Sequence, residues 1–232
     1  MIVMLCVALT ACKNDSDSSP TEPINRPGNI LANPSFEIDI IKSDPKAWKW
    51  LDWSKHWGPF EISNTVSHSG KKSALLTFDV KPGNPSKKIK GVLQTLTPDT
   101  FPDVAGGWYR IENWNRGVKR QYLQFVVIAW EDFGEFTNYQ LRYILEGVTM
   151  QPLNLMNAKY TIIPTSSVPK TGEWKYFELP IRDDYQKLWG KVPDKYKKID
   201  FFWEARFDEE PKNASHIRAD VYYDDLYIGS GK

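Results

Sequence analysis

Hydrophobic and polar residues alternate in short runs through most of the chain, and Gly, Pro, Asn or Asp separates one run from the next. A period of two residues is typical of β-strands with one buried face, whereas no long segment after residue 28 shows the period of about 3.6 residues of an amphipathic helix. The pattern predicts strands at residues 29–36, 60–63, 73–80, 91–96, 108–113, 122–130, 139–145, 160–163, 175–180, 199–207 and 221–228. One helical turn is expected within residues 187–198.

Many short strands without intervening helices indicate an all-β protein, and in particular an antiparallel two-sheet β-sandwich of the jelly-roll type. A chain of 232 residues is long enough for one such domain. Neither an internal repeat nor a linker after Gly28 marks a second domain. We therefore expect one β-sandwich domain over residues 29–232.

Residues 1–28 differ in character from the rest of the chain. Residues 1–11 form an apolar run that is too short to span a bilayer. The run ends in Leu9-Thr10-Ala11-Cys12, which resembles the lipobox of bacterial lipoproteins, where the cysteine receives the lipid. A positively charged start is missing, so we expect a truncated signal peptide. Residues 12–28 are polar and contain several prolines, which predicts a flexible tether.

This interpretation makes Cys12 the lipidation site and places the protein at a bacterial membrane, at the outer membrane or cell surface. The charged residues after Cys12 resemble the surface-export signals of some Bacteroidota lipoproteins. Removal of Cys6 with the signal peptide leaves no cysteine that could pair in a disulfide. Stability is then expected from the hydrophobic core and from a metal ion.

Charge and aromatic content narrow the range of partners. The formal net charge is +1, with basic and acidic residues interspersed, whereas a nucleic-acid partner would need a concentrated basic face. The chain contains 10 Trp, 11 Tyr and 11 Phe. These residues favour strands and also supply flat binding surfaces. We expect no nucleic-acid partner, and membrane contact only through the lipid.

The last predicted strand, residues 220–228, contains a candidate metal ligand. Strict alternation places Asp224 on one face with Leu226 and Ile228, which are expected to be buried. A buried carboxylate needs a hydrogen-bond donor, a cationic side chain or a metal ion. We expect the first predicted strand to lie beside this last strand, which makes Glu37 a candidate second ligand.

Several motifs resemble, in their order, the family 4/9-type carbohydrate-binding modules of the galactose-binding-like superfamily. The motifs are Asn33-Pro34-Ser35-Phe36-Glu37, His68-Ser69-Gly70-Lys71-Lys72-Ser73-Ala74-Leu75, Gly172-Glu173-Trp174-Lys175-Tyr176-Phe177 and Tyr223-Asp224-Asp225-Leu226. They span residues 29–229, and the resemblance weakens over residues 108–156, where such modules carry their ligand specificity.

The resemblance implies a jelly roll that binds glycans, together with a structural Ca²⁺ held by Glu37, Asp224 and backbone carbonyls. Two carboxylates and several carbonyls can supply the six to eight or so oxygen ligands that Ca²⁺ prefers. The alternative is that Glu37 is solvated, while backbone donors or a lysine satisfy Asp224.

Residues 48–57 contain four tryptophans, which a loop between two strands cannot bury completely. Tryptophan rings stack on the apolar faces of sugar rings, so Trp50, Trp53 and Trp57 are candidate ligand-binding residues. The alternative is that some of these rings cap the end of the sandwich. His56 lies within this stretch and His68 follows it, and both are isolated, without metal-binding or catalytic spacing.

Three central predicted strands each have one apolar face and one face with long polar side chains. If the polar faces line one sheet, they form a groove with aromatic borders. Arginines in such a groove suit carboxylates and paired hydroxyls, which fits an acidic, uronate-containing glycan. The alternative is a solvated sheet face with Arg–Glu pairs between strands. The candidate ligand-binding residues of this face are Tyr122, Gln124, Trp130, Gln140, Arg142, Glu204 and Arg206.

A second hypothesis is that the same fold is a glycoside hydrolase or a polysaccharide lyase. A glycoside hydrolase needs two carboxyl groups roughly 5–10 Å apart, for which Glu204 with Glu146 or Glu131 is the available pairing. A lyase needs a base beside a group that neutralises a uronate.

The lyase candidates are Tyr139, Gln140 and Arg142, but no local motif fixes either catalytic set. The favoured function is therefore non-catalytic binding of a polysaccharide or oligosaccharide, near partner enzymes that degrade glycans. A structural or adhesive surface lipoprotein is the third alternative.

Overall fold

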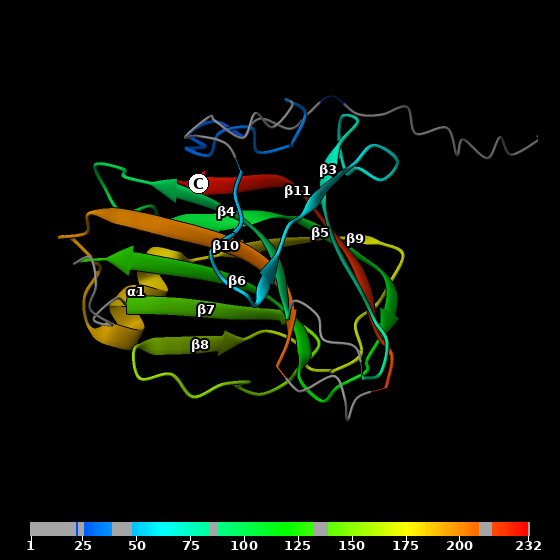
Figure 1. The fold of residues 1–232 in the computed structure, drawn as a ribbon. Coiled ribbons are helices and arrows are strands. Elements are labelled where there is room, and N and C mark those ends of the chain that lie inside the picture. Colours follow the sequence, from blue (N-terminus) through cyan, green and yellow to red (C-terminus); the bar gives the residue numbers. More distant parts are fainter. Residues whose placement is uncertain are drawn as a thin grey trace, which may run out of the picture.

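The computed structural model describes residue 22 and residues 26–38, 48–83, 88–131, 139–208 and 215–231. Two β-sheets pack face to face in this part of the chain (Figure 1). The six-stranded sheet, sheet A, has the order β1 (Trp57–Gly58), β4 (Ile89–Leu96), β10 (Lys198–Phe207), β6 (Gln121–Trp130), β7 (Tyr139–Glu146) and β8 (Ala158–Ile162). The five-stranded sheet, sheet B, has the order β2 (Glu61–Ser63), β3 (Ser73–Val80), β11 (Ile217–Gly229), β5 (Val104–Asn115) and β9 (Trp174–Leu179).

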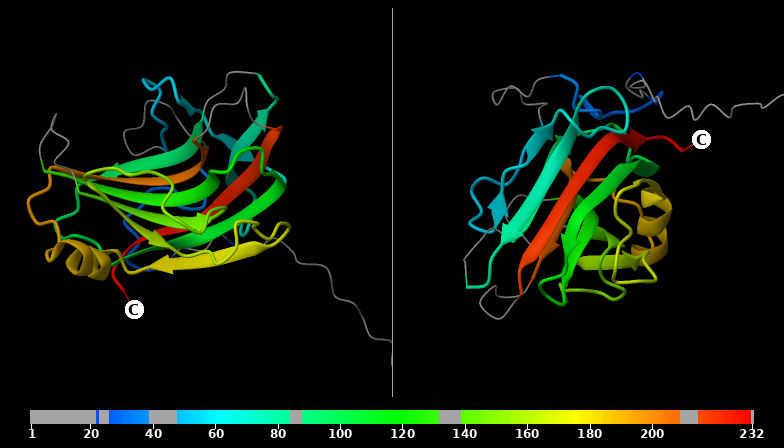
Figure 2. Two further views of the ribbon diagram at one scale, coloured as in Figure 1. Left: turned by 90° about the horizontal axis from the view of Figure 1, so that it is seen from below. Right: turned by 90° about the vertical axis from the view of Figure 1, so that its right-hand side faces the viewer.

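The predicted two-sheet β-sandwich is confirmed. From β3 to β6, and again from β9 to β11, successive strands alternate between the sheets, as in jelly-roll winding. The two layers are visible from both directions in Figure 2. Pairing is antiparallel except at two edges of sheet A, where β1 with β4 and β7 with β8 run parallel. No helix in the described ranges is long and apolar enough to cross a membrane.

The core lies between the sheets because each central strand turns its apolar face inward. In β6 the inward residues are Leu123, Phe125 and Val127, as alternation predicts. The Trp203 ring of β10 packs 4.9 Å from Phe125, between ring centroids. Burial of each such side chain contributes about 1.5–3 kcal/mol, so this interface is the main source of stability.

Residues 29–36 do not form the predicted first strand. Asn33 and Phe36 have left-handed backbone conformations, with φ of 49° and 58°, which break an extended run. The segment nevertheless lies beside β11, as expected: the Ile30 N–H donates to the Ile228 carbonyl at 2.9 Å. The Leu226 N–H donates to the carbonyl of Pro34 at 3.0 Å.

The faces of β11 differ from the prediction. Tyr223 points into the core, and so do Leu226 and Ile228, although strict alternation places Tyr223 on the opposite face. The cause is an irregularity in the pairing with β5 between Asp224 and Tyr227, where Asp225 has a φ of 46°. Asp224 is therefore buried, but not on the core face with Leu226.

The one described α-helix, α1 (Ile181–Trp189), lies nearer the N-terminus than the turn expected within residues 187–198. Ile181 and Tyr185 are buried, and Trp189 stacks on Tyr185 with ring centroids 4.9 Å apart. This spacing of apolar residues is that of a helix face packed on a core. The helix ends at Gly190, whose φ of 74° favours glycine.

Two glycines with positive φ offer a matched test of how tightly the backbone packs where Gly147 meets the start of β6. In a Gly147→Ala variant the new Cβ would collide with the Gln121 carbonyl and lie 2.8 Å from Cα of Tyr122, whereas Gly172 has no atom within 4 Å of that position. Gly172→Ala should cost roughly 1–2 kcal/mol from its backbone conformation alone. Gly147→Ala should cost about 1–3 kcal/mol more, because backbone must move. Equal urea midpoints for the two variants would contradict this packing.

Candidate functional site

The face of sheet A that points away from sheet B, here called the outer face of sheet A, brings together four of the predicted ligand-binding residues. Gln124 lies opposite Glu204, and Tyr122 lies opposite Arg206, in the register of β6 and β10. The inward faces of the same strands belong to the core, so all four side chains project outward.

Hydrogen bonds and ion pairs connect these side chains. Nε2 of Gln124 donates to Oε2 of Glu204 at 2.5 Å, and Nη1 of Arg206 lies 3.7 Å from the same oxygen. Nη2 of Arg206 donates to Oδ1 of Asp208 at 2.5 Å, while the Tyr122 hydroxyl donates to Oδ2 of Asp208 at 2.6 Å. Arg206 thus joins two carboxylates. We call these five residues the polar cluster.

Burial and neighbouring groups together set the protonation states of Arg206 and Tyr122. Burial alone would lower the pKa of Arg206, but Tyr122, Glu204 and Asp208 beside it raise this pKa above its usual value. The guanidinium is therefore charged. Burial also raises the pKa of Tyr122, and the neighbouring carboxylates add to this rise, so the phenol keeps its proton and acts as a donor.

Among the described residues, two buried polar atoms on this face lack a hydrogen-bond partner: Oε1 of Gln124 and the hydroxyl of Tyr160. Tyr160 lies in β8 opposite Arg142, and its pKa is raised by burial against the opposing effect of Arg142 and Arg206. An unpaired buried polar group costs about 1–3 kcal/mol. Because both atoms are enclosed, the partner that fits them is an internal water and not a ligand on the surface.

The other two predicted polar residues of this face form a separate pair. Nη2 of Arg142 donates to Oε1 of Gln140 at 2.7 Å, and Nε donates to the same oxygen at 3.2 Å. Arg142 is half-buried and lies opposite Val126 of β6 and Tyr160 of β8. Its position connects the polar cluster to the edge of the sheet.

An apolar cluster occupies the part of the outer face of sheet A towards β1 and β4. Trp57 packs on Phe202, with ring centroids 5.6 Å apart. Trp50 and Trp130 border the cluster and are half-buried. Two further features of Trp130 are a hydrogen bond from Nε1 to Asp200 at 2.7 Å and the Lys198 ammonium 4.9 Å from the ring centroid. The remaining members of the apolar cluster are Leu93, Val126 and Ile128.

The tryptophans of residues 48–57 therefore have different roles. Trp48 belongs to the core between the sheets, where it stacks on Phe36 at 4.9 Å. Trp57 is buried in the apolar cluster, and Trp50 lies at its border. Trp53 is 80% exposed and belongs neither to the core between the sheets nor to the apolar cluster. The structure thus brings Trp50 and Trp57 to the outer face of sheet A and leaves Trp53 in solvent.

The carboxyl pairs considered for hydrolysis do not share a site. Glu146 accepts from the hydroxyl of Tyr109 at 2.9 Å and pairs with Lys175 at 2.5 Å, so it points toward sheet B. Glu204 points the other way, into the polar cluster. Glu131 lies 3.7 Å from Lys191.

The residues considered for a lyase are also separated. Tyr139 packs against Trp189 of α1, with ring centroids 5.8 Å apart, on the face of β7 opposite Gln140 and Arg142. The trio therefore does not meet around one substrate position. Of the two catalytic arrangements that the sequence allowed, the geometry assembles neither.

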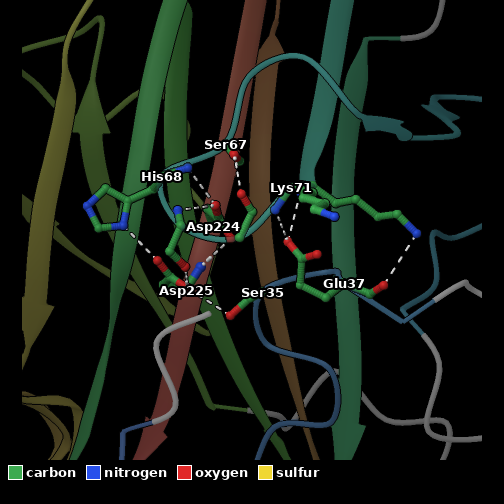
Figure 3. A network of polar contacts seen from close by, with 10 residues as sticks. Ser35, Glu37, Ser67, His68, Lys71, Asp224 and Asp225 are labelled. Atoms are coloured by element: carbon green, nitrogen blue, oxygen red, sulfur yellow. Dashed lines mark hydrogen bonds and ion pairs between the residues drawn. The ribbon is translucent and has the colours of Figure 1, made fainter. Parts of the chain in front are cut away.

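The predicted metal ligands Glu37 and Asp224 both bind the turn at residues 67–72 (Figure 3). Oε1 of Glu37 accepts the N–H groups of Lys71 at 2.6 Å and Lys72 at 2.8 Å. Oδ2 of Asp224 accepts the N–H of His68 at 2.7 Å. The described ranges hold no group of three or more His, Cys, Asp or Glu residues arranged around a metal position.

Asp224 is fully buried beside a second carboxylate, Asp225. Burial, followed by the charge of Asp225, raises the pKa of Asp224 to about 8, against the opposing effect of three backbone N–H groups. Those donors belong to His68, Ser69 and Asp225. These three backbone donors surround the Asp224 carboxyl in the described structure.

Sequence reasoning missed Asp208 and Tyr160. Asp208 follows Glu204 and Arg206 at a spacing of two residues, so extension of the alternation by one step would have placed it on the same face. Tyr160 lies in a parallel edge strand, whose neighbour no local pattern identifies. Cys12, residues 1–21 and most of the predicted tether lie outside the described residues.

No family model matches this chain, and at the level of sequence none of the curated proteins matches it. A solved structure with similar architecture is the enzymatically active domain of tailspike protein 4 of bacteriophage CBA120, with a TM-score of 0.43 and 11% identity over 87% of this chain and 21% of that chain. A carbohydrate-binding module of the β-sandwich superfamily has a TM-score of 0.40 and 9% identity over 73% of this chain and 52% of that chain.

A proposed glycoside hydrolase from Bacteroides thetaiotaomicron has a TM-score of 0.42 and 12% identity over 75% of this chain and 57% of that chain. This chain therefore spans between about a fifth and just over half of the length of the three proteins. Similarity at this level assigns neither a family nor a function.

Arg206 should be far more important for stability than an exposed arginine. Arg206→Met leaves Glu204 and Asp208 buried without their common cation, which should cost about 3–5 kcal/mol in the free energy of unfolding. Arg110→Met, the matched control, removes a half-exposed pair with Glu112 and should cost about 0–1 kcal/mol. Guanidinium denaturation measures both values, and equal losses would show that the polar cluster is not an ionic unit.

Proposed function

We propose that the chain binds a polysaccharide or oligosaccharide without catalysis, and that the ligand lies on the outer face of sheet A. The observation that carries this proposal is that the half-buried rings of Trp50 and Trp130 share one face with the half-buried polar pair of Gln140 and Arg142. A sugar hydroxyl both donates and accepts hydrogen bonds, so adjacent hydroxyls of one ring suit an amide and a guanidinium together.

The apolar cluster provides the second requirement for sugar recognition. Pyranose rings have flat C–H faces that pack on aromatic side chains, while hydroxyls at the ring edge bind polar groups. Trp50 and Trp130 border the apolar cluster on the same face as Gln124. A bound glycan would therefore stack at this border and direct hydroxyls toward the polar cluster.

The charges of this face favour a neutral or weakly acidic glycan. Arg206 is already paired with two carboxylates, and together these three charges sum to one negative charge. Arg142 has a neutral partner, Gln140, so its guanidinium suits a uronate. A strongly anionic polymer would meet the carboxylates of Glu204 and Asp208.

We further propose that Cys12 carries a lipid and that residues 12–28 tether the β-sandwich to a bacterial outer membrane or cell surface. The support is the resemblance of Leu9-Thr10-Ala11-Cys12 to a lipobox and the polar, proline-containing sequence after it. In this arrangement the domain would hold a glycan near membrane-associated enzymes that degrade it.

A structural Ca²⁺ bound by Glu37 and Asp224 is part of the proposal. Both carboxylates meet the same turn, so one ion could be held by them together with backbone carbonyls. A cation would also offset the repulsion between Asp224 and Asp225, which now raises the pKa of Asp224.

Binding is tested by affinity gel electrophoresis of residues 28–232 in hydroxyethyl cellulose, xylan, galactomannan, laminarin and polygalacturonate. The Arg142→Ala/Trp130→Ala double variant should weaken retardation by the polymer that retards the wild type, because it removes one hydrogen-bonding group and one ring from the proposed face. Lys159→Ala is the matched control for charge, since Lys159 lies opposite Leu141, on the other face of sheet A. Trp53→Ala is the control for an exposed ring away from this face.

The expected loss in the double variant is at least tenfold in affinity, from about 1.5 kcal/mol or more. Unchanged binding in the double variant, together with a loss in Trp53→Ala, would move the site to residues 48–57. Absence of retardation of the wild type by all five polymers would favour the structural or adhesive alternative.

Calcium binding is tested by the melting temperature in Ca²⁺ and in EDTA. An ion at a hundred times its Kd stabilises the folded state by about 2.7 kcal/mol, or roughly 5–10 °C for a domain of this size. The increase should be larger at pH 8 than at pH 6, because Asp224 must lose its proton to bind the ion. Equal melting temperatures in Ca²⁺ and EDTA at both pH values would disprove the site, and Glu37→Gln should remove any difference.

A further inference from the structure

The outward face of sheet B carries a group of aromatic rings that the proposed function does not use. Trp108 of β5 lies opposite Tyr176 of β9, with ring centroids 5.3 Å apart. Trp174 lies two residues before Tyr176, so it shares the same face. The ring of His68 stacks on Trp108 at 3.9 Å and meets Trp174 edge-on at 5.6 Å. We call these four rings the sheet B platform.

A buried network fixes the orientation of His68 (Figure 3). Nδ1 of His68 lies 2.6 Å from Oδ2 of Asp225, whose side chain is 1% exposed. Oδ1 of Asp225 accepts hydrogen bonds from the hydroxyls of Ser35 and Ser69, each at 2.7 Å. Because both serines donate to Asp225, neither hydroxyl is activated by His68 as a nucleophile would be.

This contact places a proton on Nδ1 of His68. The Asp225 carboxylate only accepts hydrogen bonds, so Nδ1 donates to it and the second ring nitrogen, Nε2, is left to face a ligand. The hydrogen bonds described for this ring use Nδ1, and the side chain is 18% exposed. A left-handed residue, Asp225 with a φ of 46°, thus positions a ring nitrogen beside an aromatic patch.

Polar groups border the platform at the Tyr176 end. The Tyr176 hydroxyl donates to Oε2 of Glu178 at 2.7 Å, and Nη1 of Arg26 donates to the same oxygen at 2.5 Å. The Arg26 guanidinium lies 3.9 Å from the ring centroid of Tyr227. Nη2 of Arg26 is enclosed, without a hydrogen-bond partner among the described residues, so a ligand does not reach it. The polar groups that this border offers are therefore the Glu178 carboxylate and the Tyr176 hydroxyl.

We propose that the sheet B platform is a second saccharide-binding surface, which takes the rings of a neutral glycan. Tyr176 is 50% exposed, and Trp108 and Trp174 are half-buried, so the platform is supported from below and open to solvent. Polar groups flank the rings: Nε2 of His68 on one side, and the Glu178 carboxylate with the Tyr176 hydroxyl on the other. This alternation of flat apolar rings and hydrogen-bonding groups matches a sugar ring with hydroxyls at its edge.

The charges of the platform select against an acidic glycan. Arg26 is paired with Glu178, and Arg110, which lies opposite Trp174 on the same face, is paired with Glu112. Both arginines beside the rings are therefore already neutralised, which favours a neutral glycan over a uronate. From Trp174 to Glu178 the strand extends about 13 Å, which is longer than one sugar ring.

The inference shares its ligand class with the proposed function but not its site. The outer face of sheet A and the platform of sheet B lie on opposite sides of the sandwich, so one domain would hold two glycan segments. Two weak sites on one tethered domain raise the apparent affinity for a polymer through effective concentration.

The test uses residues 22–232, so that Arg26 is present, in gels that contain hydroxyethyl cellulose, xylan, galactomannan or laminarin. The Arg142→Ala/Trp130→Ala variant serves as background because it disables the outer face of sheet A. This background should keep residual retardation by a neutral polymer. Adding Tyr176→Ala should weaken that residual binding about tenfold, whereas Tyr176→Phe, which keeps the ring, should retain most of it. Trp53→Ala in the same background should leave it unchanged.

The outcomes separate the two sites. Loss of all binding in the background variant, or residual binding that Tyr176→Ala does not change, would overturn the sheet B platform and leave the outer face of sheet A as the site. Loss of binding through Tyr176→Ala alone, with no effect of the background substitutions, would support the platform and overturn the first site. Absence of wild-type retardation by all neutral polymers would overturn the platform proposal.

Discussion

The two adjacent carboxylates of β11, Asp224 and Asp225, are the constraint on which both ends of the chain depend. Neighbouring buried carboxyl groups are costly unless donors surround them. Asp224 takes its donors from the backbone of the 67–72 turn, and Asp225 takes its donors from Ser35, Ser69 and His68. The N-terminal segment, the turn and the last strand must therefore be in place together.

This network has a structural consequence and a chemical one. Structurally, β11 lies between β3 and β5 in sheet B, so a bulge at Asp225 fixes how the turn before β3 meets the last strand. Chemically, a buried carboxylate orients His68 on Trp108 at the surface. The buried Asp225 carboxylate therefore also determines where the partly exposed His68 ring lies.

The two outward faces differ in how their polar groups are satisfied. On sheet A, ion pairs connect the polar side chains, and half-buried tryptophans lie beside them. On sheet B, the rings are stacked and partly open, and the ion pair of Arg26 and Glu178 lies at their edge. Both faces combine aromatic surface with polar side chains, and this combination supports the proposed binding of sugars on each.

The sequence by itself determined the all-β class, most strand positions and the inward faces of β6, β7 and β10, because a two-residue period specifies which side chains share a face. It also placed Tyr122, Gln124, Glu204 and Arg206 together, because alternation and antiparallel pairing are local rules. Only the tertiary structure decided the bulge at Asp225, the ion network that includes Asp208, and the stacking of His68 on Trp108. These features depend on contacts between residues far apart in the chain, for which local periodicity carries no information.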